Sequence, residues 1–314
     1  MGGTPASCPA LAALAAGLLL GGPALAERGF LTNQTANSVW EVDLASGEKL
    51  REWAIPGAPA GVAVAPSGLV YVTSPETGTV TAIDPESGAL TPIAVGGGPL
   101  GIAANPVTGE VYVADWYADR LTVIRDGAPA GIVGVGHSPS GVAVTPDGAT
   151  ILTADRDSDE VSVIDAKSFT RLATIPVGAR PFGVTIDATG ARAYAANVGS
   201  NSVSVIDIAA RKVVGSVPTD ERPYKVALAQ GRGFVTNSYG SDLTVFDLES
   251  LAPIGTIEVG DYPEGIEATK DGRTLYVANW FSNTMSRVDA AAMEVTGEIE
   301  TGDGPRSFGD FIHD

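Results

Sequence analysis

The sequence is poor in the side chains that form disulfides, metal centres and basic binding surfaces. It has one cysteine, Cys8, and two histidines, His137 and His313, among 314 residues. Acidic residues outnumber basic ones by 37 to 19, which gives a formal net charge of −18. A chain with one cysteine has no internal disulfide and no cluster of thiolate ligands. The acidic balance argues against sequence-independent binding to nucleic acid or to an anionic membrane surface.

Long apolar runs are also missing, except at the N-terminus. Residues 1–26 carry no charged side chain, hold an apolar run at Leu11–Leu20 and end in Ala24-Leu25-Ala26, the small-x-small pattern of a signal-peptide cleavage site. We expect residues 1–26 to be a signal peptide, Glu27 to begin the mature protein, and the product to be periplasmic or secreted. Because no Lys or Arg precedes the run, a misassigned start or an uncleaved anchor is the alternative. No other segment reaches the roughly 18 apolar residues of a membrane span.

Nearly the same four-residue phrase recurs seven times. The copies lie 40 to 42 residues apart and begin at Phe30 (FLTN), Tyr71 (YVTS), Tyr112 (YVAD), Leu152 (LTAD), Tyr194 (YAAN), Phe234 (FVTN) and Tyr276 (YVAN). Such a period is typical of repeated units that bury their faces against one another. Within Gly141–Gly178, four short β-branched runs are separated by turn signals such as Pro146-Asp147-Gly148. Four antiparallel strands per repeat make a propeller blade, so the sequence predicts an all-β, seven-bladed β-propeller in a single domain over residues 27–314.

The count of hairpins predicts how the ring closes. Seven interblade loops carry a proline, but only six turns join a first strand to a second, so the first blade lacks its own innermost strand. The C-terminal stretch Ser307–Ile312 (SFGDFI) follows the last loop, where such a strand belongs. We expect it to complete the blade that begins at Phe30. Pairing both termini in one blade protects the sheet edges.

The phrases YVTS, YVAN and SVSVID, together with the Gly-x-x-Pro-x-Gly loops, make the chain resemble the YVTN family of β-propeller repeat proteins. The resemblance covers Gly29–Asp314. It implies the propeller fold and an exported or surface protein. Some members are tied to periplasmic oxidation pathways, and one type binds single-stranded DNA. The family has no shared catalytic motif, so the fold alone leaves the function open.

Residues that recur in every blade are assigned to the scaffold. An aspartate begins the same turn in six blades, at Asp43, Asp84, Asp165, Asp207, Asp247 and Asp289, and an asparagine ends the second strand at Asn33, Asn197, Asn237 and Asn279. Side chains of this kind form local hydrogen bonds with the backbone in turns. We therefore expect structural roles for them.

Function is expected where one blade differs from its siblings around the channel mouth. Beside the loop prolines, blades two to four carry small or neutral residues, whereas the other blades carry Arg180, Phe182, Arg222, Tyr224, Tyr262 and Arg306. Nearby loops add Trp280 and Phe281, with Trp116 across the ring and His137 on the loop into blade four. Guanidinium groups bind carboxylates or phosphates by two-point contacts, and aromatic rings supply contact area. These residues predict a site for a small anionic ligand or a protein partner. The alternative is that Arg180 and Arg222 pair with Asp220 and Glu221 while the tryptophans plug the channel.

Catalytic and metal chemistry finds little support in the residues. His137 and His313 are expected at opposite ends of the propeller, so we expect no copper, zinc or haem site and no bound cofactor. The segment Asp155–Glu160 (DRDSDE) lacks the glycine and the distant glutamate of a calcium loop, and we assign it to a turn. No G-x-S-x-G turn accompanies His137.

The leading hypothesis is an exported, monomeric, non-enzymatic β-propeller that binds a small anionic ligand or a protein partner at its mouth. The resemblance adds the role of an accessory factor in a periplasmic oxidation pathway. Two alternatives stay open. One is a metal-assisted hydrolase or lactonase that would depend on Asp115 and Asp155, and the other is an interaction scaffold for a periplasmic oxidoreductase, with no ligand of its own.

Overall fold

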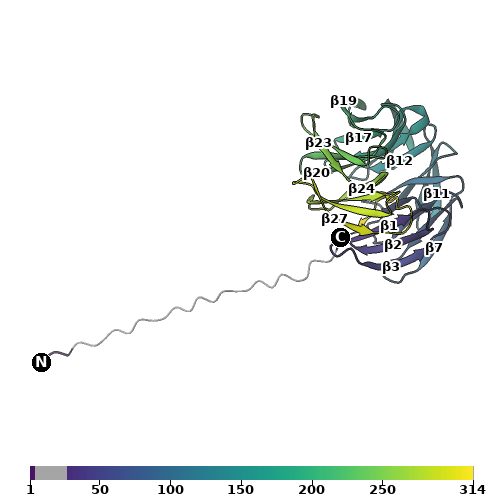
Figure 1. Ribbon diagram of the computed structural model, residues 1–314. Coiled ribbons are helices and arrows are strands. Elements are labelled where there is room, and N and C mark those ends of the chain that lie inside the picture. The colour runs from purple at the N-terminus through teal and green to yellow at the C-terminus, as the bar shows by residue number, and fades with distance from the viewer. Residues whose placement is uncertain (4–26, 314) are drawn as a thin grey trace.

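The protein is a ring of seven antiparallel sheets (Figure 1). The computed structural model describes residues 1–3 and 27–313, so most of the expected signal peptide lies outside the described residues. The predicted seven-bladed β-propeller with four strands per blade is confirmed. Helix is limited to one short 3₁₀ turn in the described part of the chain, η1 (Arg156–Ser158). Within that part, no helix is long and apolar enough to cross a membrane.

The strands follow the repeat closely. The first blade holds β1 (Arg28–Asn33), β2 (Ser38–Asp43) and β3 (Lys49–Ala54); the second β4 (Gly61–Val64), β5 (Val70–Ser74), β6 (Thr79–Ile83) and β7 (Leu90–Ala94); the third β8 (Pro99–Ala104), β9 (Val111–Asp115), β10 (Arg120–Arg125) and β11 (Ala128–Gly134); the fourth β12 (Pro139–Val144), β13 (Thr150–Asp155), β14 (Glu160–Asp165) and β15 (Thr170–Pro176). The fifth holds β16 (Pro181–Ile186), β17 (Arg192–Asn197), β18 (Ser202–Asp207) and β19 (Lys212–Pro218); the sixth β20 (Pro223–Ala229), β21 (Arg232–Asn237), β22 (Asp242–Asp247) and β23 (Pro253–Glu258); the seventh β24 (Pro263–Ala268), β25 (Thr274–Asn279), β26 (Thr284–Asp289) and β27 (Glu294–Glu300).

The recurring polar residues hold turns and strand ends. Asp165 Oδ1 accepts the Ser168 N–H at 2.7 Å, and Asp247 does the same for Ser250. Asn237 is fully buried at the end of β21, where its Nδ2 donates to Thr244 Oγ1 at 2.8 Å. Each bond satisfies a polar group that the repeat would otherwise leave unpaired.

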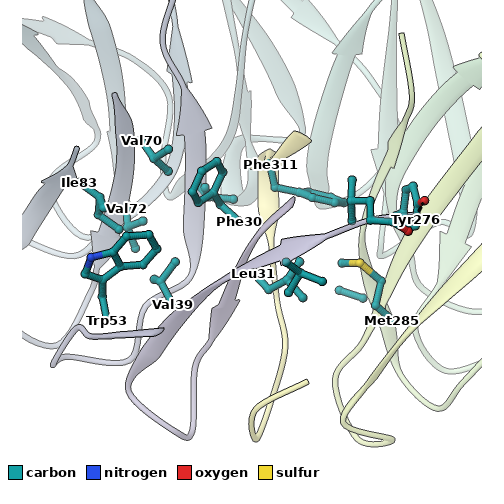
Figure 2. Packing of buried hydrophobic residues seen from close by; sticks show 14 of the residues in the cluster. Phe30, Leu31, Val39, Trp53, Val70, Val72, Ile83, Tyr276, Met285 and Phe311 are labelled. Atoms are coloured by element: carbon teal, nitrogen blue, oxygen red, sulfur yellow. Dashed lines mark hydrogen bonds between the residues drawn. The ribbon is translucent and has the colours of Figure 1, made fainter. Parts of the chain in front are cut away.

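The C-terminus closes the ring on the first blade, as expected. Strand β29 (Ile312–His313) pairs antiparallel with β1, with Ile312 opposite Gly29. The buried ring of Phe311 lies in the cluster that joins the first blade to Tyr276 of the seventh (Figure 2). The preceding strand β28 (Phe308–Asp310) pairs in parallel with β4 and adds a fifth strand to the second blade. The Phe308 ring packs against Phe182 and Tyr224, which belong to blades five and six.

Glycine allows the innermost strands to crowd around the channel. Five of the seven interblade loops end in Pro-x-Gly, and a Cβ on Gly101 would lie 1.8 Å from the Ser140 carbonyl oxygen of the next blade. The ladders of β8, β12, β16, β20 and β24 are interrupted just after the proline, as between Pro181 and Val184. A bulge of this kind re-aims a side chain.

Candidate functional site

In the loops that lead into blades five and six, the residues on the two sides of the proline take opposite roles at the channel mouth. Arg180 and Arg222, before the proline, are exposed and form a rim, whereas Phe182 and Tyr224, after it, are buried and form a floor. Arg180 and Arg222 stand on the rim with φ of 53° and 57°. Their main-chain N–H groups are held by Asp159 Oδ1 at 2.7 Å and Asn201 Oδ1 at 3.0 Å. The rim backbone is therefore fixed, while its side chains project from the protein.

An aromatic floor closes the channel below the rim. The ring centroids of Phe182 and Tyr224 lie 4.1 Å apart, and both contact Phe308 of the C-terminal strand, at 5.1 and 5.7 Å. Phe182 and Tyr224 are 6% and 8% exposed. Both were predicted as ligand-contacting residues, and the structure places them in this floor, with Phe182 also lining a hollow of the mouth. The alternative of an aromatic plug thus applies to these two rings rather than to the tryptophans.

Arg306 lies beside the floor and is paired. Its Nε lies 2.8 Å from Glu264 Oε2 without hydrogen-bond geometry, and its Nη2 donates to the Tyr224 hydroxyl. Burial raises the pKa of Glu264, and Arg306 opposes that rise. Burial is the largest influence on the pKa of Arg306 and acts to lower it, but Glu264 and Tyr224 together outweigh it and the pKa is raised. Since its charge is compensated internally, Arg306 is not the free anion ligand that the sequence predicted.

Four aromatic side chains of blades six and seven form a continuous cluster on the rim, which we call the aromatic ridge (Tyr239, Tyr262, Trp280 and Phe281). The Tyr262 ring lies 5.3 Å from Tyr239, 6.0 Å from Trp280 and 4.9 Å from Phe281. Tyr239 is 50% exposed and Phe281 63%. The guanidinium of Arg222 lies 4.2 Å from the centre of the Tyr239 ring. Burial, followed by the hydrogen bond with Tyr239, raises the pKa of Tyr262 to about 12, so its hydroxyl stays neutral.

Arg222 therefore meets an aromatic face rather than Asp220 or Glu221. Asp220 Oδ1 instead accepts the N–H of Glu221 at 2.8 Å. Arg180 is exposed and forms no ion pair with the residues that the structure describes. These two arginines and the ridge are the part of the predicted site that faces solvent.

A hollow lies across the mouth from the ridge, over the blades with small loop residues. This mouth cleft has a volume of about 310 Å³ and is lined by Gln34, Leu100, Trp116, Tyr117, Phe182 and Arg306, with Glu76 on its edge. Trp116 stands between the Phe182 ring, at 6.0 Å, and the Arg156 guanidinium, at 5.3 Å. The predicted residue Trp116 therefore forms a cleft wall rather than part of the ridge.

His137 lies apart from both features. It is exposed, and its Nδ1 lies 2.7 Å from Asp119 Oδ2. That hydrogen bond and the charge of Asp119 raise the pKa of His137. The pair joins the loop into blade four to the preceding blade, which indicates a bracing role.

The acidic residues required by the hydrolase alternative are engaged separately. Asp115 contacts Arg120 Nε at 3.1 Å and accepts the Gly98 N–H at 2.9 Å. Asp155 accepts hydroxyls from Thr153 and Ser162, and burial raises its pKa to about 6. Within residues 1–3 and 27–313, no group of three or more His, Cys, Asp or Glu side chains is placed to hold a metal ion. The hydrolase alternative therefore gains no donor set from this part of the chain.

Three residues of the mouth and channel were missed by the sequence analysis. Tyr239 is the outermost ring of the ridge, Gln34 lines the cleft, and Lys225 lies in the channel. Lys225 replaces the glycine of the Pro-x-Gly loop in blade six, which was a usable signal. Its Nζ donates to the Gly309 carbonyl and lies 3.7 Å from Asp310. It thereby binds the C-terminal strand to the sixth blade.

Comparison with known proteins supports the fold and goes no further. No family model matches the chain. The PE-PGRS family protein PE_PGRS18 of Mycobacterium tuberculosis is 50% identical over 52 residues, which span 16% of this chain and 11% of that protein.

Among solved structures, Kuenenia stuttgartiensis hydrazine synthase is similar with a TM-score of 0.74 and 20% identity, over 80% of this chain and 89% of that one. A Bacteroides fragilis protein described as a candidate 6-phosphogluconolactonase gives 0.76 and 17%, over 92% and 98%. The dihydro-heme d1 dehydrogenase NirN, solved with DHE, gives 0.65 and 17%, over 88% and 74%. At these identities the likeness shows a shared propeller architecture.

Proposed function

We propose that the protein is an exported, non-enzymatic binding protein whose mouth receives a protein partner on the aromatic ridge and Arg222. The ridge itself carries the proposal. Its four rings are connected through Tyr262, two of them are at least half exposed, and the Arg222 guanidinium lies over the Tyr239 ring. Trp, Tyr and Arg are the residues enriched in the hot spots of protein interfaces. Exposed clusters of large apolar groups mark interaction sites.

Charge indicates the kind of partner. Arg222 lies against the ridge at Tyr239, and Arg180 adds a second exposed positive charge on the loop into blade five, in a protein with a formal net charge of −18. A local basic patch in an acidic field favours a partner that presents carboxylates next to apolar side chains. A small anionic ligand is less well supported, because the third arginine of the predicted site is neutralised by Glu264.

The role of an accessory factor in an oxidation pathway, implied by the repeat resemblance, belongs to the same proposal. One similar fold belongs to a dehydrogenase. We place this chain as a partner of such an enzyme rather than as the enzyme, because the described residues supply neither a metal-binding cluster nor a free pair of acids at the mouth.

Site-specific photocrosslinking in the producing cells tests the proposal. A benzoylphenylalanine at position 281 should yield one discrete crosslinked species, identified by mass spectrometry. The matched control is position 132 on an outer strand, because Ile132 is 62% exposed and Phe281 63%. Arg222→Ala should reduce the crosslink at position 281. Equal yields from both positions, or a crosslink only to a second copy of this chain, would contradict the proposal.

A further inference from the structure

We propose that the mouth cleft is a binding site for a small, flat, neutral ring that carries a carbonyl group. The volume of about 310 Å³ lies at the lower end of the range for small-molecule sites, which suits a single-ring ligand. The cleft combines apolar walls with the polar side chains of Gln34, Arg306 and Glu76. That combination of walls and oriented polar groups is the usual make-up of a ligand site.

Three aromatic side chains, Trp116, Tyr117 and Phe182, line the cleft. Trp116 is held between Phe182 and Arg156, so its ring is positioned before any ligand arrives. Tyr117 lies close against the backbone of Gly98, where a Cβ would come within 2.6 Å of its ring. A slot bounded by rings and by Leu100 favours a planar, apolar body through offset or edge contacts.

The polar groups present hydrogen-bond donors. The indole Nε1–H of Trp280 can only donate, so the Gln34 oxygen must face it, at 3.1 Å. The amide NH₂ of Gln34 is then left to donate to a ligand. In Arg306, the hydrogen bond to Tyr224 uses one of the five N–H groups of a guanidinium, and Nε faces Glu264. The ligand should therefore bring an acceptor to this end of the cleft.

Charge distinguishes a carbonyl from a carboxylate. Glu264 compensates Arg306 at 2.8 Å, and Glu76 adds a further negative charge at the edge. A neutral acceptor gains the hydrogen bonds without the repulsion that an anion meets in such a field. The site differs from the ridge in residues and in ligand, although the Trp280–Gln34 bond links the two.

The test uses nicotinamide as the probe, with pyridine, which has no carbonyl, and nicotinate, which is an anion, as matched comparisons. The readout is the indole N–H signal of Trp116 in nitrogen-15 NMR spectra, assigned with Trp116→Phe. Nicotinamide should shift this signal saturably and bind more tightly than pyridine or nicotinate.

Two variants of the full chain complete the test. Gln34→Glu keeps the acceptor for Trp280 but replaces the donor that faces the ligand, so it should weaken nicotinamide binding by about fivefold, the loss expected for one hydrogen bond. Leu100→Trp should fill the cleft and abolish the response. Ile132→Ala, at an exposed position of the outer strand β11, should leave it unchanged. Pyridine binding as well as nicotinamide, nicotinate binding better, or an unaltered response in Gln34→Glu or Leu100→Trp overturns the proposal.

Discussion

Ile312 donates its main-chain N–H to Glu267 Oε2 at 2.9 Å, and Phe311 donates to the same oxygen. The last strand of the chain is therefore bonded to a carboxyl group of the seventh blade, while β29 pairs with the first blade. Lys225 holds the preceding strand from the sixth blade. The C-terminus is thus a clasp that joins four blades, because β28 also pairs with the second.

Removing residues 307–314 should lower the melting temperature of the whole protein. Deletion opens the ring and exposes the aromatic floor that Phe308 completes. A narrower variant, Phe311→Ala, removes a fully buried ring and should reduce the free energy of unfolding by about 3–5 kcal/mol, measured by denaturant titration. Val107→Ser, at a side chain that is 65% exposed, is the control and should change little. A truncated protein as stable as the full chain would contradict the clasp.

The clasp should also respond to pH through Glu267. Burial, followed by the charge of Asp310, raises the pKa of Glu267 from about 4.5 to about 8, although Lys225 acts in the opposite direction. Between these values the folded protein keeps a proton that the unfolded chain has released, so stability falls as pH rises through that window. Glu267→Gln should remove this fall. The two proteins should therefore differ most in melting temperature near pH 9, where the variant is the more stable relative to pH 5.

The effect of Glu267 is the difference in melting temperature between the wild-type protein and Glu267→Gln at each pH. Other groups, such as Asp155, titrate in the same window and contribute equally to both. If the two curves of melting temperature against pH run parallel, Glu267 does not hold the proton, and the clasp is insensitive to pH.

The fold could be predicted from the sequence because each blade repeats the same pattern of four short strands and the turns between them. The phrases beginning at Tyr194 and Tyr276 take the same strand position, and the prolines mark the same loops. Closure by the C-terminus was also predictable. The parallel pairing of β28 was not, because it depends on Phe308 packing against Phe182 and Tyr224, which are distant in the sequence.

The site could be predicted only as a face of the molecule. Arg222 and Tyr224 flank one proline and look equivalent in the sequence, yet one is exposed and the other buried. The charge of Arg306 is compensated by Glu264. The repeat pattern does not indicate that these two residues are neighbours. The cleft lies where small residues such as Gly98 leave space between larger side chains. Such a space depends on the folded arrangement, so no residue in the sequence predicts it.

The pair Arg306–Glu264 should behave as a structural unit of the floor. Arg306→Met leaves a buried carboxylate without its cation, which should reduce the free energy of unfolding by about 3–5 kcal/mol at neutral pH. The loss should shrink at low pH, where Glu264 takes up a proton. The double variant Arg306→Met with Glu264→Leu should regain most of the stability, since apolar replacement of a buried pair is often neutral. A double variant no more stable than Arg306→Met would show that the pair stabilises the floor by more than mutual charge compensation.

Arg222→Ala should separate binding from stability at the ridge. The side chain is exposed and stacks on Tyr239, so its removal should leave the melting temperature nearly unchanged. Binding of the crosslinked partner, once purified, should weaken by about 1–3 kcal/mol, the range for hydrogen bonds that involve a charged group.

Arg211→Ala is the matched control, because Arg211 is also exposed and has φ of 54° against 57° for Arg222. Added salt should weaken binding to the wild-type protein more than binding to Arg222→Ala, because the lost interaction is partly screened. If the two alanine variants bind the partner equally well, Arg222 does not contact it and the partner lies elsewhere on the propeller.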